Sequence, residues 1–367
     1  MKLQLDVSRC VRATSKFSIC NKCVDVVPDS ISLVDNLPTF TNSTGVEASA
    51  CIGSCPTEAF SLSDFSTTQF FFNFLDSKIR LISPKINVPC ISVLSVEHLI
   101  SLAIASDEDV VLDMSSYDSN SILFEIISNR IEEANFVLSS FCDKELKTNF
   151  TPSKEIVDRD EKEESSRRSF LGNVSLKGAV KHKKAFDEAI VEDELKRFKF
   201  DTSLISKIKE KSIPDKRKIL LTTLKRANVP NVFEVLPEED VSFISQKFVD
   251  ESCTNCQICY RICPTEALSS NGKFSIINFD SMLCVKCHLC HDVCEPNSIQ
   301  LQSGFEIKEL FEPSTRALAK FNIKRCNECG NPFTYKGGII ECPRCKAEEE
   351  EAMFLHSNAK VMRGNIV

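Results

Sequence analysis

Residues 253–264 read Cys253-Thr-Asn-Cys256-Gln-Ile-Cys259-Tyr-Arg-Ile-Cys263-Pro264, which is the spacing C-x2-C-x2-C-x3-C-P. Residues 284–294 repeat the four-cysteine spacing as Cys284-Val-Lys-Cys287-His-Leu-Cys290-His-Asp-Val-Cys294. Two-residue gaps let one tight loop present three thiolates to three corners of a [4Fe–4S] cluster, and in this pattern the fourth cysteine of each run serves the other cluster. The two runs therefore predict two clusters with ligands that cross between the runs.

The crossing assigns each of the eight cysteines to a cluster. One cluster is predicted to be held by Cys253, Cys256, Cys259 and Cys294, and its neighbour by Cys284, Cys287, Cys290 and Cys263. Zinc bound by the same thiolates is the alternative interpretation. Eight cysteines in a double run favour the clusters, because this pattern is far more specific than a lone C-x2-C pair.

The segment 249–302 resembles the bacterial two-[4Fe–4S] ferredoxin family in these eight cysteines and in the Cys263-Pro264 pair. The resemblance implies a fold in which two β-ribbons and short helices surround two clusters that are close enough to exchange electrons. One position departs from the family pattern, because the proline that normally follows the last cysteine stands one place later, at Pro296.

A second module of this kind is expected near the N-terminus, since Cys55-Pro-Thr-Glu-Ala repeats the five letters that begin at Cys263. Counted back from Cys55, the template places ligands at positions 51, 48 and 45. The chain has Cys51, Ala48 and Gly45 there, so this loop has lost two ligands.

The other half of the N-terminal module is also incomplete. Counted back from Val27-Pro28, the template places ligands at positions 27, 23, 20 and 17, where the chain has Val27, Cys23, Cys20 and Phe17. With crossed ligands, one of the two clusters would retain Cys51 alone and cannot form.

We therefore predict a single N-terminal [4Fe–4S] cluster held by Cys10, Cys20, Cys23 and Cys55, with Cys51 as a spare thiol. Cys10 is the available fourth donor and gives the spacing C-x9-C-x2-C. The chain resembles multi-ferredoxin electron carriers that have such a lengthened first gap. A degenerate module that holds zinc or no metal is the alternative.

A third cysteine group lies near the C-terminus. Cys326, Cys329, Cys342 and Cys345 have the spacing C-x2-C-x12-C-x2-C. Two such knuckles offer four thiolates in a tetrahedron, which suits a structural zinc ion, and the segment resembles a zinc ribbon. Gly330 fits the tight turn after the first knuckle. Rubredoxin-like iron uses the same ligands and remains the alternative.

Between the first two cysteine groups, apolar periodicity predicts a small α/β unit. Strands are expected at 79–82 and 110–112, and helices at 96–104 and 122–138. Charge dominates from 143 to 168, and helical patterns return at 184–198 and 215–225.

The predicted fold class is α+β, with ferredoxin-like modules, a small α/β domain and a zinc ribbon. The predicted divisions are 1–65 (degenerate ferredoxin module), 66–142 (α/β), 143–214 (charged linker and helices), 215–305 (two-cluster ferredoxin) and 306–367 (ribbon and acidic tail).

The composition of the 367-residue chain sets the context for its 19 cysteines. No apolar stretch is long enough for a membrane span and the first residues lack a secretory core, so a cytoplasmic location is expected. In a reducing compartment, clustered cysteines indicate metal ligation rather than disulfides. Cys90 and Cys142 stand outside the three groups, and a buried structural thiol is the expectation for Cys90.

Electron transfer is the predicted function. The formal charge of −7 argues against a primary role on nucleic acid, although a nucleic-acid-binding ribbon stays open as a third interpretation. We expect a non-catalytic electron carrier that serves a redox protein or oxidoreductase complex. Resemblance alone makes a formate dehydrogenase or hydrogenase complex plausible. The competing interpretation is an Fe–S and zinc scaffold, or an assembly or regulatory factor for an oxidoreductase.

Overall fold

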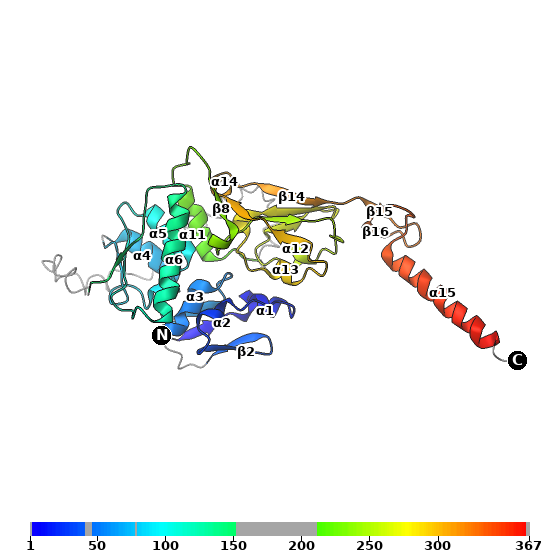
Figure 1. Cartoon of the computed structure of the whole chain (residues 1–367), viewed down its shortest axis with the longest axis horizontal. Coiled ribbons are helices and arrows are strands. Elements are labelled where there is room, and N and C mark those ends of the chain that lie inside the picture. The colour runs from blue at the N-terminus through cyan, green and yellow to red at the C-terminus, as the bar shows by residue number, and fades with distance from the viewer. Residues whose placement is uncertain (1, 41–45, 78, 152–210, 365–367) are drawn as a thin grey trace.

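The computed structural model describes residues 2–40, 46–77, 79–151 and 211–364. Figure 1 shows the N-terminal unit and a small α/β unit beside the central unit, with a ribbon and a long helix projecting from its far side. Helices and strands are mixed along the chain, as expected for an α+β protein. The predicted helix at 184–198 and most of the predicted linker 143–214 lie outside the described residues.

Two antiparallel strand pairs build the N-terminal unit. Strand β1 (Leu3–Leu5) pairs with β4 (Phe60–Leu62), and β2 (Ile31–Val34) forms a hairpin with β3 (Leu37–Phe40). The hairpin turns at Asp35-Asn36, where both residues have positive φ angles, a conformation that short polar side chains tolerate. The helices are η1 (Val7–Arg9), α1 (Val11–Thr14), α2 (Lys22–Val26), η2 (Val46–Ser49) and α3 (Ala50–Ser54).

The α/β unit has a three-stranded parallel sheet with the order β5-β6-β7. Its strands are β5 (Leu81–Ile82), β6 (Val111–Asp113) and β7 (Lys147–Asn149), and its helices are α4 (Thr67–Asp76), η3 (Ile91–Val93), α5 (Val96–Ala105) and α6 (Ile122–Ser139). The predicted strands and helices of this unit are confirmed, with ends that shift by one or two residues. The sequence missed β7, because its polar letters Lys-Thr-Asn show no alternation of apolar residues.

Each long helix of this unit begins at a serine. The hydroxyls of Ser66, Ser95 and Ser121 accept hydrogen bonds from the backbone N–H groups of the first turns of α4, α5 and α6. Such caps satisfy N–H groups that have no partner inside the helix, and each contributes about 1 kcal/mol.

The central unit repeats the strand pairing of the N-terminal unit. Its first strand β9 (Lys247–Val249) pairs with its last strand β12 (Ile299–Leu301), and the middle strands β10 (Leu268–Ser270) and β11 (Ile276–Asp280) pair with each other. Strand β14 (Thr315–Lys320) extends this middle pair to three strands. Each cysteine run includes a short helix: α12 (Ile258–Ile262) in the first run and α13 (Leu289–Asp292) in the second. The single turn η7 (Ser281–Leu283) directly precedes the second run.

Helix α11 (Asp215–Leu224) packs against α5, and it also contacts α4 and α14 (Lys308–Phe311). The predicted helix at 215–225 is confirmed. Strand β8 (Val235–Pro237), followed by η6 (Glu238–Asp240), pairs with β13 (Gly304–Glu306). One hydrophobic core runs through these elements, from Leu3 in the N-terminal unit to Leu310 in α14. This core joins the N-terminal and α/β units to Met282 and Phe305 at the edge of the central unit, which has a separate core around Leu268, Phe279 and Leu283.

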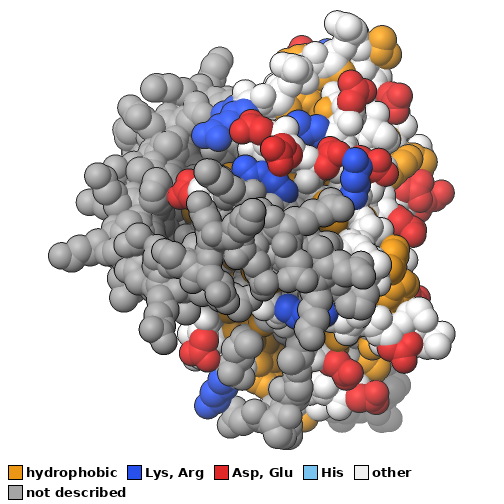
Figure 2. All heavy atoms as spheres, turned by 90° about the vertical axis from the view of Figure 1, so that its left-hand side faces the viewer, with side chains coloured by type: hydrophobic (Ala, Val, Ile, Leu, Met, Phe, Trp, Pro, Cys, Tyr) orange, Lys and Arg blue, Asp and Glu red, His pale blue; other side chains and the backbone are white. Residues whose placement is uncertain are grey.

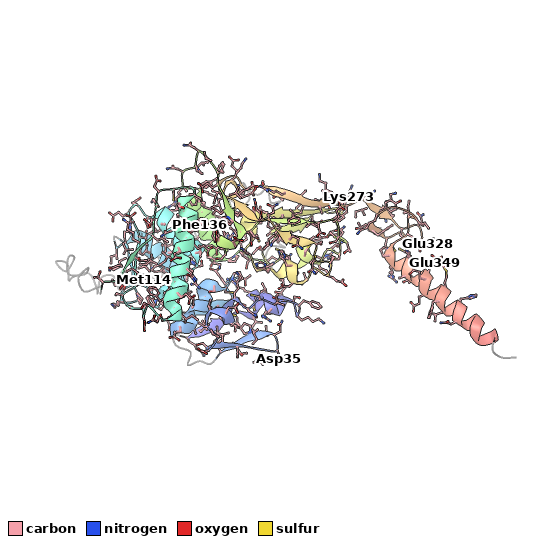
Figure 3. The ribbon with its side chains drawn as sticks, in the orientation of Figure 1. Asp35, Met114, Phe136, Lys273, Glu328 and Glu349 are labelled. Atoms are coloured by element: carbon pink, nitrogen blue, oxygen red, sulfur yellow. The ribbon has the colours of Figure 1, made fainter. Side chains whose placement is uncertain are left out.

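The C-terminal region begins where the chain leaves β14. Strands β15 (Ile323–Arg325) and β16 (Pro332–Thr334) form a short hairpin, and α15 (Pro343–Gly364) projects away from the body of the molecule (Figure 1). Figure 3 places Lys273 at the end of the central unit that faces this hairpin. On the described part of the face shown in Figure 2, acidic and basic side chains are interspersed.

Candidate iron–sulfur and metal centres

Four thiols line a cavity of about 330 Å³ in the central unit, part of which is open to solvent. They belong to Cys263, Cys284, Cys287 and Cys290. Cys284 directly follows η7, Cys290 lies within α13, and Cys263 arrives from the other run at the end of α12. Three thiols thus come from one run and the fourth from its partner. We call this the Cys284 site.

A second cavity of about 320 Å³ has the reciprocal lining. Its thiols belong to Cys253, Cys256, Cys259 and Cys294, and we call it the Cys253 site. Among the eight central thiols, Cys256 is exposed, whereas the others are buried or half-buried. The fold therefore gathers the eight cysteines into two groups of four.

Left-handed residues shape both cysteine loops. Asn255 and Gln257 have φ angles of 56° and 72°, and Lys286 and His288 have φ angles of 47° and 61°. Each such residue flanks the second cysteine of its loop. Alternation of left- and right-handed residues turns successive N–H groups toward one side, which creates a concave site for an anion. Non-glycine residues adopt this conformation at a cost of about 1–2 kcal/mol each, so the loops are shaped for a ligand.

The repeated Cys-Pro-Thr-Glu-Ala segment has the same local structure in both units. The Sγ atom of Cys55 lies 3.7 Å from the hydroxyl of Thr57, and the Sγ atom of Cys263 lies 3.8 Å from that of Thr265. The glutamate that follows is left-handed in both copies, with φ 53° at position 58 and 60° at position 266. The backbone N–H of Ala59 also donates to the Cys55 Sγ atom at 3.3 Å.

Cys10 occupies the same local position as Cys284. The Asp6 carboxylate caps the turn before Cys10 by accepting from Ser8, and the Asp280 carboxylate caps the turn before Cys284 in the same way. Cys10 has φ −75° and ψ 122°, and Cys284 has φ −75° and ψ 125°. The long gap between Cys10 and Cys20 therefore follows a first cysteine whose setting is that of a ligand loop.

The strands that flank these turns agree as well. The N–H of Asp6 donates to the carbonyl of Ala59 at 2.7 Å, and the N–H of Asp280 donates to the carbonyl of Ala267 at 2.8 Å. In both units, the strand before the capping aspartate pairs with the strand that follows Cys-Pro-Thr-Glu-Ala. Cys10 and Cys55 are thus connected as Cys284 and Cys263 are.

The N-terminal thiols lie close enough to affect one another. Burial, followed by the neighbouring thiols of Cys55, Cys20 and Cys10, raises the pKa of Cys23 to about 12. Burial likewise raises the pKa of Cys20, with Cys55 and Cys10 among its neighbours. These pKa shifts place Cys10, Cys20, Cys23 and Cys55 near one another, and Cys51 shares Cys23 and Cys55 as neighbours.

Cys51 has a different environment. It is fully buried, and burial raises its pKa, with Cys55, Cys23 and the Arg130 guanidinium as charged or ionisable neighbours. Ala48 and Val27, which occupy ligand positions of the template, are buried apolar residues. Packed apolar side chains thus occupy two of the ligand positions of the template, and the template position at residue 45 lies outside the described residues.

The Arg130 side chain of α6 connects α3 of the N-terminal unit with η3 of the α/β unit. Its guanidinium donates to the carbonyls of Ala50 and Leu94 at 3.1 and 2.9 Å, and it also bonds to the Ser92 carbonyl. Burial lowers its pKa to about 10. A side chain at Gly53 would overlap the guanidinium, so the approach of Arg130 requires glycine at that position.

The donor sets fit iron–sulfur clusters chemically. Burial raises the pKa of Cys259 and Cys290 to about 12, so these thiols would stay protonated without a cation. A coordinated metal removes the thiol proton, and four thiolates are the usual ligands of a [4Fe–4S] cluster. Both central cavities offer four thiols, left-handed loops and a largely buried setting, which match that requirement.

His288 and His291 lie beside the Cys284 site. The Nε2 atom of His291 is 2.7 Å from the Nζ atom of Lys247, and Lys247 and His288 both line the cavity. Burial, followed by the nearby Lys247 charge, lowers the pKa of His288 to about 4 and that of His291 to about 3.

The C-terminal cysteines form a compact group. The Sγ atoms of Cys326, Cys329, Cys342 and Cys345 all lie within 4.8 Å of one another. Gly330 follows the first knuckle with φ 71°, where glycine avoids strain. The backbone N–H of Cys329 lowers the pKa of Cys326 to about 6, which favours the thiolate that binds a metal. The four residues thus have the spacing and proximity of a single-ion site.

The hairpin that carries this group contacts the Cys253 site. The amide of Asn255 donates to the hydroxyl of Thr334 at 3.0 Å, and the Lys336 Nζ atom lies 3.4 Å from the carbonyl of Cys253.

A buried ion network joins three units at α11, and the sequence did not reveal it. The Glu97 carboxylate of α5 pairs with Lys216 at 3.2 Å and with Arg217 at 2.7 Å. Lys216 also donates to the carbonyl of Cys55 at 2.8 Å, and Arg217 donates to the carbonyl of Met282 at 2.9 Å. Burial favours the neutral acid of Glu97, but the two cations hold its pKa below the ordinary value.

The remaining cysteines lie apart from these groups. Cys90 is fully buried in the α/β unit, with its Sγ atom 2.9 Å from the Ser92 hydroxyl and 3.3 Å from the Tyr117 hydroxyl. It is therefore a buried thiol, as expected. Cys142 is half-buried, and burial raises its pKa.

Comparison with known families supports an iron–sulfur site in the central unit. Residues 247–269 match the family model of the 4Fe-4S binding domain. This segment contains the first cysteine run, so the chain carries a 4Fe-4S binding domain of ferredoxin type, which indicates a 4Fe-4S cluster and an electron-transfer role. No curated protein matches the chain. Within the described residues, no helix combines the length and apolar character that a membrane crossing needs.

Proposed function

We propose that this protein is a cytoplasmic, polyferredoxin-like electron carrier with three [4Fe–4S] clusters and a zinc-binding ribbon. Two clusters belong to the central unit and one to the N-terminal unit. The observation that carries the proposal is the reciprocal lining of the two central cavities, each of which takes three thiols from one run and one from the other. Two separate metal sites would each take all four ligands from one run, whereas crossed ligands are typical of paired [4Fe–4S] clusters.

The N-terminal ligand set Cys10, Cys20, Cys23 and Cys55 is supported by the local repeat. Cys10 shares its backbone angles and its capping aspartate with Cys284, and Cys55 shares its threonine contact with Cys263. Cys51 is left as a spare thiol, because the other template positions that the structure describes are filled by apolar residues.

When bound, a [4Fe–4S] cluster accepts and releases single electrons. The chain supplies thiolate ligands, backbone N–H donors and burial that limits access of water. It also holds the sites in fixed relation, since α11 bonds to the carbonyl of Cys55 through Lys216 and to that of Met282 through Arg217. The N–H of Ile19 adds a second connection to Asp292 at 3.0 Å.

A redox protein or oxidoreductase complex is the proposed partner, with a formate dehydrogenase or hydrogenase complex as the plausible kind. Cys256 is the exposed thiol among the eight central ligands. A partner that approaches Cys256 would meet a proposed ligand of the Cys253 site at the protein surface. Cys326, Cys329, Cys342 and Cys345 are proposed to hold structural zinc, because four thiolates close the coordination sphere.

Metal and sulfide analysis of anaerobically purified protein tests the proposal. We expect about twelve iron and twelve sulfide per chain, together with about one zinc. About eight iron would remove the N-terminal cluster, and about thirteen iron without zinc would turn the ribbon into an iron site.

Reductive titration followed by electron paramagnetic resonance then tests the role of the clusters. Signals that appear on reduction with dithionite and disappear on reoxidation support a carrier. Clusters that stay silent over the accessible range would favour the scaffold or assembly factor.

A further inference from the structure

A buried cation distinguishes the two central sites. Lys247 is 3% exposed and lines the cavity of the Cys284 site, where the charge on its side chain also acts on Cys290. Lys247 lies on β9, which precedes the first cysteine run. It nevertheless lines the site that takes three of its four thiols from the second run.

The Lys247 side chain has a neutral partner. Its ammonium group has donors only, so the Nε2 atom of His291, 2.7 Å away, accepts the hydrogen bond. Within residues 2–40, 46–77, 79–151 and 211–364, no carboxylate forms an ion pair with Lys247. A buried charge without a counter-charge is costly. The anion that this cavity provides is a cluster held by four thiolates.

Lys286, which lies in the second cysteine run, differs from Lys247 because a carboxylate pairs with its charge. It lies between two cysteines of the second run, but its Nζ atom pairs with the Glu238 carboxylate at 2.5 Å. Its positive charge is therefore largely compensated, whereas that of Lys247 is not.

Among the described residues, the lining of the Cys253 site includes no buried cation like Lys247. Besides its cysteines, the described residues that line its cavity are apolar or neutral polar residues. Two lysines approach its backbone from outside the cavity. Lys336 lies 3.4 Å from the carbonyl of Cys253 and is exposed, and the half-buried Lys211 donates to the carbonyl of Tyr260 at 3.2 Å, so water and salt screen both charges more than that of Lys247. Among the described residues that line the two cavities, the sites thus differ by one buried positive charge that has no carboxylate partner.

We propose that Lys247 raises the reduction potential of the Cys284 site above that of the Cys253 site, so that an electron entering the pair resides on the Cys284 site. Reduction adds negative charge to the site, and a nearby fixed cation stabilises the reduced form more than the oxidised form. One electron comes from an external low-potential donor, and no bond forms or breaks. The inference rests on the proposed electron-transfer function and the crossed ligand sets.

The order of reduction in the otherwise unchanged chain gives the first test. Dithionite is added in steps, and the electron paramagnetic resonance signals are followed against the measured potential. Cys256→Ser alters a ligand of the Cys253 site and labels the signal of that site. We expect the signal that appears first to be unaffected by Cys256→Ser, and the later signal to change. The reverse order would overturn the inference.

Substitution of Lys247 gives the second test. In Lys247→Met, which removes the charge and keeps the length, we expect the reduced-to-oxidised ratio of the Cys284 site at a fixed potential to fall about tenfold, or ~59 mV for one electron. Lys247→Arg retains the charge and should restore most of the ratio. The control Lys308→Met removes an exposed lysine with the same change in net charge and should leave the ratio unchanged.

The outcomes separate this inference from the proposed function. If the unchanged chain shows no reducible signal, the electron-carrier function is wrong, and the inference falls with it. If two signals reduce but Lys247→Met shifts neither, the inference alone is wrong. If Lys247→Met fails to assemble its clusters, the order of reduction in the Cys256→Ser chain decides the question.

Discussion

Cys51 and Cys55 lie one turn apart at α3, and replacing each with serine tests the N-terminal ligand set. Both thiols are buried, at 0% and 8% exposure, and both changes exchange one sulfur atom for oxygen. The pair is therefore matched in position, burial and chemistry. The proposed ligand set contains Cys55 and excludes Cys51.

We expect one variant to lose iron and the other to lose stability. Cys55→Ser removes one of four ligands and should lose about four of roughly twelve irons, with a fall of about one third in the visible absorbance near ~400 nm. Cys51→Ser should keep all iron. It places a hydroxyl in a fully buried setting and should lower the free energy of unfolding by about 1–3 kcal/mol, the cost of burying a poorly paired hydroxyl.

The assay is iron and sulfide content per chain, measured on both variants and on the unchanged protein after anaerobic purification. Thermal unfolding followed by circular dichroism reports the stability change. Equal iron content in the two variants would refute the assignment, and loss of iron from Cys51→Ser alone would move the fourth ligand from Cys55 to Cys51.

Three further changes test the packing and the C-terminal site. Glu97→Gln leaves two buried cations of α11 uncompensated and should cost about 3–5 kcal/mol in guanidinium denaturation, whereas the exposed-pair control Glu312→Gln should cost less than about 1 kcal/mol. Gly53→Ala forces a methyl group into the buried guanidinium behind α3 and should cost about 1–3 kcal/mol in the same assay; Gly272→Ala, which meets nothing within 4 Å, should be nearly neutral. In the metal-free site, the backbone N–H of Cys329 lowers the pKa of Cys326 to about 6, whereas hydrogen bonds with Cys342 and Cys329 raise the pKa of Cys345. A bound zinc ion keeps all four cysteines as thiolates, and acid releases the ion by protonating them. Zinc measured after dialysis should therefore be retained at about pH 7 and lost in acid, and zinc that stays bound through dialysis against strong acid would contradict a thiolate site.

The cysteine spacing accounts for most of the predicted central site. A two-residue gap restricts how three thiols can be presented, so the spacing indicates a cluster loop before any tertiary contact is known. Apolar periodicity likewise located α5, α6 and the buried strands of the parallel sheet, because these segments bury a continuous face. It missed β7, whose residues are polar. The domain divisions and the ligand assignments stay predictions.

Other features could not be predicted from local sequence. The Glu97 pairs join residues about 120 positions apart, and the contact of Lys247 with His291 joins residues 44 positions apart. A lysine or a glutamate carries no local signal for its partner, because exposed charges of the same types occur along the whole chain.

The sequence by itself determined which cysteines form groups, since ligand spacing is a property of adjacent residues. Tertiary structure decided that Cys10 has the same setting as Cys284, and that Lys247 lines one central cavity whereas the described residues that line the other include no charged side chain. The physical reason is that a buried charge acts through its distance and its surroundings, and both are set by packing between elements that lie far apart in the chain.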